Sequence, residues 1–164
     1  MITKNKARFT KDAAGKKITV IKEVDASPDK VWEAWTTSQQ LDKWWAPKPY
    51  KAVTRRMDFR EGGSWLYKME GPEGKGQWDK FEYNKIDKPK LYTAKAGFSD
   101  ENGQRKPGEP VWNWKNSFIK TADGTRIESE ISFEKKEDMD KILDTGFEEG
   151  YSSGLDNLDE LLSH

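Results

Sequence analysis

The chain contains no cysteine and only one histidine, His164, which is the last of its 164 residues. Without cysteine there are no disulfides, no thiol catalysis and no thiolate metal sites. A Ser-His-Asp triad or a multi-histidine metal site would have to use a chain terminus, where order is usually poorest. We therefore expect no metal and no cofactor, and the sequence identifies no catalytic residue.

The chain also lacks long hydrophobic runs and an excess of charge of either sign. No apolar run approaches the roughly 18 residues that span a bilayer, and the lysine-rich N-terminus lacks the apolar segment of a signal peptide. Lys plus Arg equals Asp plus Glu, at 29 each, so global charge does not favour a nucleic-acid or membrane partner. These features predict a cytoplasmic protein and leave its oligomeric state open.

Aromatic residues, in contrast, are abundant: eight Trp, seven Phe and five Tyr. Tryptophan buries a large area and often keeps its indole N–H hydrogen bonded. The rings can therefore form an ordinary core, or they can line a pocket for a flat ligand. Both interpretations remain open, and they can apply to different tryptophans.

The order of predicted elements indicates one domain over residues 17–163, preceded by a polar arm at 1–16. The arm either contains a short edge strand at 7–10 or is a disordered tail. A strand at 17–25 precedes two short helices at 28–36 and 39–44, with Ser27 as N-cap and Pro28 in the first turn of the first helix. Alternation and turn signals then predict hairpin-linked strands at 50–59, 64–70, 77–87, 90–98, 111–120 and 125–133.

The last quarter, residues 137–162, has the apolar periodicity of one long amphipathic helix. Gly146, Gly150 and Gly154 lie four residues apart within it, and each costs about 0.5–1 kcal/mol relative to alanine. Residues at this spacing share one helix face, which we expect to face the sheet. Either a bulky sheet residue packs against the backbone there, or the face borders a cavity.

A run of antiparallel strands with one apolar face needs a cover, and only the C-terminal helix is long enough to provide it. The sequence therefore predicts an α+β fold. In it, a curved antiparallel sheet of about six or seven strands wraps around the long C-terminal helix, and two short helices follow the first strand.

Five sequence blocks form a recognisable pattern: DASPDKVWEAWTTSQQLDKWWAP (25–47), MDFREGGSW (57–65), MEGPEG (69–74), GFSDENG (97–103), and GFEEGY with LDNL (146–158). Together they resemble the SRPBCC superfamily (START and birch-pollen-allergen-like proteins). More narrowly, they resemble the branch named after the C-terminal domain of the activator of the heat-shock-protein-90 ATPase. The resemblance implies a helix-grip fold with a cavity between sheet and helix that holds small hydrophobic molecules. It favours the cavity interpretation of the glycines.

If the concave face lines such a cavity, eight residues are candidates for ligand binding. They are Trp45, Trp65, Trp78, Trp112, Trp114, Phe147, Gly150 and Tyr151. Alternation places Trp112 and Trp114 on one strand face. Trp44 and Trp45 are not expected to both face inward: Trp44 should anchor the short helix, and Trp45 should lie at the cavity mouth. The Tyr151 hydroxyl can bond a ligand or the backbone.

The resulting hypothesis is a binding protein for a small hydrophobic or aromatic ligand. A first alternative is a protein-interaction domain that resembles the chaperone-ATPase activator and contacts a chaperone. A second is a cyclase or hydrolase acting in the cavity, whose acid and base groups would have to be Asp, Glu, Tyr or water. Asp79 and Glu82, like Glu128 and Glu130, are expected to be surface charges.

Overall fold

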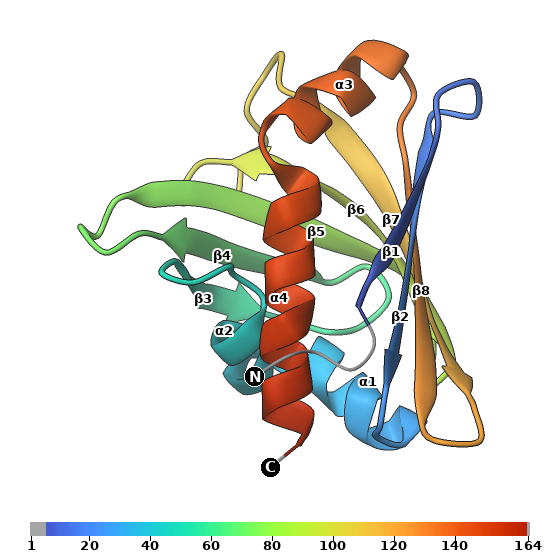
Figure 1. The fold of residues 1–164 in the computed structure, drawn as a ribbon. Coiled ribbons are helices and arrows are strands. Elements are labelled where there is room, and N and C mark those ends of the chain that lie inside the picture. Colours follow the sequence, from blue (N-terminus) through green and yellow to red (C-terminus); the bar gives the residue numbers. More distant parts are fainter. Residues whose placement is uncertain (1–5, 164) are drawn as a thin grey trace.

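The computed structural model describes residues 6–163 as one curved antiparallel sheet with helices on its concave side (Figure 1). The eight strands are β1 (Arg8–Asp12), β2 (Lys17–Val24), β3 (Lys51–Met57), β4 (Ser64–Glu70), β5 (Gly76–Asp87), β6 (Leu91–Ser99), β7 (Val111–Lys120) and β8 (Thr125–Ser132). Their order in the sheet is β1-β2-β8-β7-β6-β5-β4-β3. The helices are α1 (Pro28–Thr36), α2 (Ser38–Trp44), α3 (Lys136–Asp144) and α4 (Phe147–Leu162).

The sheet follows the predicted order but has eight strands rather than six or seven. The additional strand is β1, which pairs with β2 from Arg8 to Asp12, so part of the predicted arm belongs to the sheet. Residues 6–7 of the arm lead into β1, residues 13–16 form the turn between β1 and β2, and residues 1–5 lie outside the described part. Register shifts between Thr54 and Arg56 on β3, and between Tyr83 and Ile86 on β5, interrupt the pairing. Such bulges bend strands and increase twist, which helps the sheet curve around α4.

The two short helices begin and end close to the predicted positions. The Ser27 side chain accepts a hydrogen bond from the Lys30 backbone N–H at 3.4 Å, and Pro28 occupies the start of α1. Trp44 anchors the end of α2, because its Nε1 donates to the Ala34 carbonyl at 2.8 Å and its side chain is fully buried. The prediction that Trp44 and Trp45 cannot both face inward was wrong. Trp45 is only 9% exposed, because α1, α4 and the sheet enclose this end of α2 from different sides.

The predicted single C-terminal helix is two helices, α3 and α4, which meet at Gly146. This glycine has φ +86° in the left-handed region, which favours glycine. The Thr145 and Gly146 N–H groups donate to the Ile142 and Leu143 carbonyls, which closes α3. The prediction was wrong because one left-handed residue redirects the axis and leaves the apolar periodicity nearly intact. In Figure 1, α3 lies at one end of the sheet, while α4 crosses its concave face.

The glycines of α4 face the end of α2 rather than the sheet. A Cβ at Gly154 would lie 2.9 Å from the Trp45 carbonyl oxygen and 3.3 Å from that of Trp44, whereas a Cβ at Gly150 would meet only Pro47 Cγ at 3.8 Å. One turn on, Asn157 Nδ2 donates to the Ala46 carbonyl at 3.0 Å. Gly154 therefore permits close packing of α4 against a backbone, while Gly150 has room for a side chain.

A buried ion pair fixes the last turns of α4 to the sheet. Lys22 on β2 is 1% exposed, and its ammonium lies 2.5 Å from Asp159 Oδ2. A charge in such surroundings is tolerated only when it is paired.

Among residues 6–163, no helix combines the length and the apolar character that a membrane span requires.

The two α4 glycines give a matched test of this packing. We expect Gly150→Ala to raise the free energy of unfolding by about 0.5–1 kcal/mol, since alanine is the better helix former and the space is free. Gly154→Ala should lower it by roughly 1–3 kcal/mol, because the new methyl group would overlap a backbone carbonyl. Urea unfolding measures both values. Equal stabilities of the two variants would contradict the close approach at Gly154.

Candidate functional site

Trp45 lies at the centre of a cluster of rings between the sheet and α4. Its ring centroid is 5.7 Å from Trp65, 5.8 Å from Trp114 and 6.0 Å from Tyr151. Phe81 on β5 lies at 5.8 Å. The prediction that Trp45 lies at a cavity mouth was wrong, because the C-terminus of α2 inserts this side chain between the sheet and α4. The cluster nevertheless unites three of the predicted tryptophans with Tyr151.

Phe147 and Trp112 border this cluster. Phe147, on the first turn of α4, stacks on Tyr151 with centroids 5.6 Å apart. Trp112 faces inward on β7 as predicted, but it packs against Phe98 at 5.5 Å and Phe133 at 6.4 Å, nearer one end of the strand. Both side chains are half-buried.

Trp78 and Gly150 do not join the cluster. Trp78 pairs with Lys68 across β4 and β5 and alternates with the inward-facing Asp79, so it lies on the convex face. Gly150 faces Pro47. The prediction placed both residues at the ligand site, and both lie on other faces. Trp78 was included because it is aromatic, although strand alternation puts it opposite the inward-facing residues of β5. Gly150 is one residue from Tyr151, so it lies about 100° away around the helix.

Beneath Tyr151, three buried polar side chains form a continuous network. The Ser129 hydroxyl donates to Asn116 Oδ1 at 2.6 Å and lies 2.7 Å from the Tyr151 hydroxyl. Because the single hydroxyl proton of Ser129 goes to Asn116, Tyr151 is the donor in the second bond. Among the described residues its hydroxyl bonds Ser129 rather than the backbone, and its oxygen keeps a lone pair available. Burial raises the pKa of Tyr151, so the hydroxyl stays protonated.

A second polar chain runs from Trp45 to an acidic residue on β5. Trp45 Nε1 donates to the Tyr67 hydroxyl at 2.8 Å, and Tyr67 lies directly opposite Asp79 across β4 and β5. Burial raises the pKa of Asp79 from 3.8 to about 7, although Tyr67 and the positive charge of Lys106 both lower it. The Oδ1 atom of Asp79 is buried and has no hydrogen-bond partner among the described residues. Asp79 is therefore a carboxyl that can exchange a proton near neutral pH.

The concave face is not equally buried along its length. Phe81, Trp114 and Tyr151 are at most 6% exposed, whereas the inward-facing residues near the start of β5 and the end of β6 are half-buried. This half-buried group comprises Met69, Asp79, Phe98, Trp112 and Phe147. The concave face is thus less completely covered around Asp79 than around Trp114.

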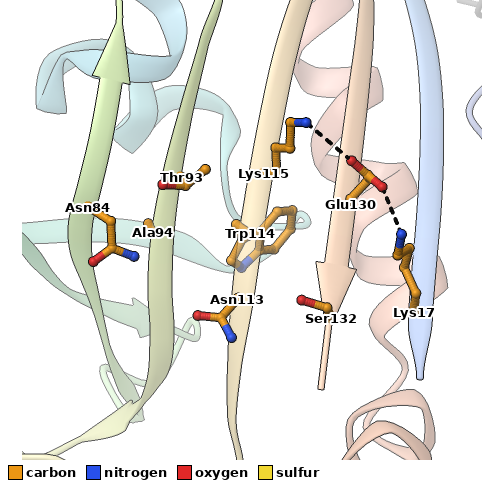
Figure 2. A pocket seen from close by; sticks show the side chains of 9 residues that line it. All are labelled: Lys17, Asn84, Thr93, Ala94, Asn113, Trp114, Lys115, Glu130 and Ser132. Carbon is orange, nitrogen blue, oxygen red and sulfur yellow. Dashed lines mark hydrogen bonds and ion pairs between the residues drawn. The ribbon is translucent and has the colours of Figure 1, made fainter. Parts of the chain in front are cut away.

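A separate, polar hollow of about 270 Å³ lies on the convex face (Figure 2). Glu130 on β8 lies at its edge and pairs with Lys17 at 3.1 Å and Lys115 at 3.9 Å. Asn84, Thr93, Asn113 and Ser132 complete the polar lining. Because the Glu130 carboxylate at its edge is already paired with two ammonium groups and the other lining residues are mostly polar, this hollow offers little for an apolar ligand.

Comparison with known proteins identifies the family. Residues 25–163 match the family model described as Activator of Hsp90 ATPase homolog 1-like protein. The chain belongs to this family. None of the curated proteins matches the chain significantly.

Solved structures agree with this assignment to the Activator of Hsp90 ATPase homolog 1-like family. A crystal structure of protein Ms6760 from Mycobacterium smegmatis is 28% identical with a TM-score of 0.88, and the match covers 94% of this chain and 95% of the other. An NMR structure of a protein from Arthrobacter aurescens is also 28% identical, with a TM-score of 0.89 and coverage of 95% and 91%. A protein from Rhodobacter sphaeroides, 15% identical over 96% and 98% of the two chains with a TM-score of 0.82, shares the fold.

Sequence reasoning missed two residues in this member of the family: Asp79 and Asn157. Asp79 was expected to be a surface charge, yet it alternates with Phe81 and Tyr83 on the inward face of β5. An acidic residue within an apolar strand face was the signal that could have identified it. Asn157 carried no such signal, because its role depends on carbonyls that belong to another helix.

The raised pKa of Asp79 predicts a pH dependence of stability. The folded state keeps the proton up to about pH 7, while the unfolded chain loses it near pH 3.8. Stability should therefore fall as pH rises between these values. Asp79→Asn should remove this loss and be more stable than the wild type at pH 8, by an amount on the order of 2–4 kcal/mol.

Urea unfolding of both proteins from pH 4 to pH 8 measures this difference. Asp87→Asn is the matched control, since it changes an exposed carboxyl at the other end of the same strand and should leave the wild-type profile unaltered. A wild-type stability that rises relative to Asp79→Asn between pH 4 and pH 7 would contradict the prediction.

Proposed function

We propose that this protein binds a small hydrophobic or aromatic molecule at the ring cluster between the sheet and α4. The observation that carries the proposal is the coincidence of flat rings with buried polar atoms that lack a partner. Trp114 faces Tyr151 with centroids 5.3 Å apart, and its Nε1 is buried without a hydrogen-bond partner among the described residues.

The energetics of that indole favour a bound acceptor. A buried donor left unsatisfied costs about 1–3 kcal/mol, and a ligand oxygen or ring nitrogen beside it would recover that cost. The surrounding rings offer stacking and edge-to-face contacts to a flat molecule. The Tyr151 oxygen, with a lone pair to spare, can accept a hydrogen bond from the same ligand.

The half-buried end of the concave face supports access to this cluster. Phe147 contacts both Trp114, at 6.1 Å, and Tyr151, at 5.6 Å, and is itself half-buried. A ligand entering beside Phe147 would meet the ring cluster without crossing the sheet. Binding pockets that join apolar rings to a few polar groups are typical of small-molecule sites.

The indole N–H signals of the eight tryptophans provide a direct test. In NMR titrations with a library of small aromatic compounds, a binding compound should shift the Trp114 and Trp45 indole signals. The Trp78 signal should stay in place, because that side chain lies on the convex face. Trp114→Phe and Trp78→Phe variants assign the two signals and serve as matched perturbations.

Two outcomes would contradict the proposal. One is a library in which no compound moves the Trp45 or Trp114 signals. The other is a set of shifts confined to Trp78 and the residues of the convex hollow around Glu130, which would place binding on the opposite face.

Activation of a chaperone ATPase, which the family description names, is a separate proposal for this chain. It rests on the family match alone. A pull-down of the chaperone combined with an assay of its ATPase rate tests it independently of ligand binding.

A further inference from the structure

Resting on the proposed function, we infer that Asp79 forms the polar end of the ligand site and selects ligands with a protonated amine on an aromatic body. The inference deepens the proposed site by naming a ligand class. It starts from the position of the carboxyl. Asp79 faces inward on β5, with Tyr67 opposite it on β4 and Phe98 opposite it on β6.

Rings surround this carboxyl on several sides. Tyr67 stacks on Trp65 with centroids 4.1 Å apart, and Phe98 packs edge-on against Trp112 at 5.5 Å. Phe81 follows Asp79 by two residues on the same strand face. Aromatic faces attract cations, and a carboxylate set among them gives an ammonium group both a charge partner and ring contacts.

No ion pair joins the Asp79 carboxyl to another described residue, and its Oδ1 atom is buried without a hydrogen-bond partner among them. The charged and titratable groups that act on it are Tyr67 and Lys106, and Lys106 is exposed to solvent. A carboxylate that is shielded from water is strongly stabilised by a positively charged partner. A bound ammonium group would be such a partner.

The hydrogen bond from Trp45 to Tyr67 favours the ionised form of Asp79. Trp45 Nε1 donates to the Tyr67 oxygen, which leaves the Tyr67 proton to point toward Asp79. Burial raises the pKa of Tyr67, so its hydroxyl remains a donor. When an ammonium approaches Oδ1, Asp79 releases its proton to solvent, and the neighbouring Tyr67 hydroxyl favours the carboxylate that remains. Near pH 7, binding of an amine should therefore release a fraction of a proton.

The location of Asp79 allows this approach. It belongs to the half-buried group of Met69, Asp79, Phe98, Trp112 and Phe147, which borders the fully buried rings. If the amino group of the ligand lies at Asp79, the aromatic part of the ligand can extend toward Phe81 and Trp114, whose ring centroids are 6.0 Å apart.

Three naphthalene probes that differ only in their polar group test the inference: 1-naphthylmethylamine, 1-naphthylmethanol and 1-naphthoic acid. At pH 7.5 we expect the amine to bind the wild type at least tenfold more tightly than the alcohol, and the acid to bind least. Asp79→Asn should weaken amine binding at least tenfold and leave the alcohol unchanged. Asp87→Asn, the control on the same strand, should bind all three probes as the wild type does.

A pH series adds a measurement that a purely structural role would not affect. The wild-type dissociation constant for the amine should rise as pH falls from 8 to 5.5, because Asp79 must be deprotonated to bind. The constant for the alcohol should not follow this dependence, and Asp79→Asn should lose it for the amine.

The failures of the two proposals are distinguishable. Equal binding of amine and alcohol, with shifts at Trp45 and Trp114, would overturn the role of Asp79 and leave the aromatic site standing. Tighter binding of the acid, or amine binding unaffected by Asp79→Asn, would overturn it equally. If none of the three probes binds, the aromatic site fails in this test and the inference about Asp79 falls with it.

Discussion

The approach of α4 to the C-terminal end of α2 is the contact on which the interior depends. Gly154 lets the helix backbone lie against the Trp44 and Trp45 carbonyls, where a Cβ would come within 2.9 Å. One turn later, Asn157 satisfies the Ala46 carbonyl at 3.0 Å, which no residue of α2 could do. The junction therefore requires a residue without a side chain, Gly154, and an amide side chain three residues later, that of Asn157. Together they hold the end of α2 beneath α4.

This junction fixes Trp45, and through Trp45 it links the two halves of the candidate site. The indole ring contacts Trp114 and Tyr151 on one side. Its N–H donates to Tyr67, which lies opposite Asp79 on the neighbouring strand. A displacement of α2 would thus alter ring packing and the surroundings of the carboxyl together. The ring cluster and the polar residues around Asp79 therefore depend on the same placement of α2 and are not two independent sites.

Local signals in the sequence predicted most of the fold, and the errors arose where geometry is not local. Ser27 and Pro28 specify the start of α1 by themselves, and strand alternation located β2 through β8 within one or two residues. The break at Gly146 was missed because a helical period continues across a single left-handed residue. The burial of both Trp44 and Trp45 was missed for a related reason: a helix end enclosed from several sides has no exposed face.

Asp79 shows the same limit at the level of the site. Alternation does place it beside Phe81 and Tyr83, but it does not say which strand supplies Tyr67 or whether a cation lies within reach. Those facts come from cross-strand register and from loops distant in sequence. The family fixes the fold, and the fold can serve many functions. In this chain the inward face of β5 carries a carboxyl among rings that makes no ion pair with another described residue, and the ligand inferred here would supply the opposite charge.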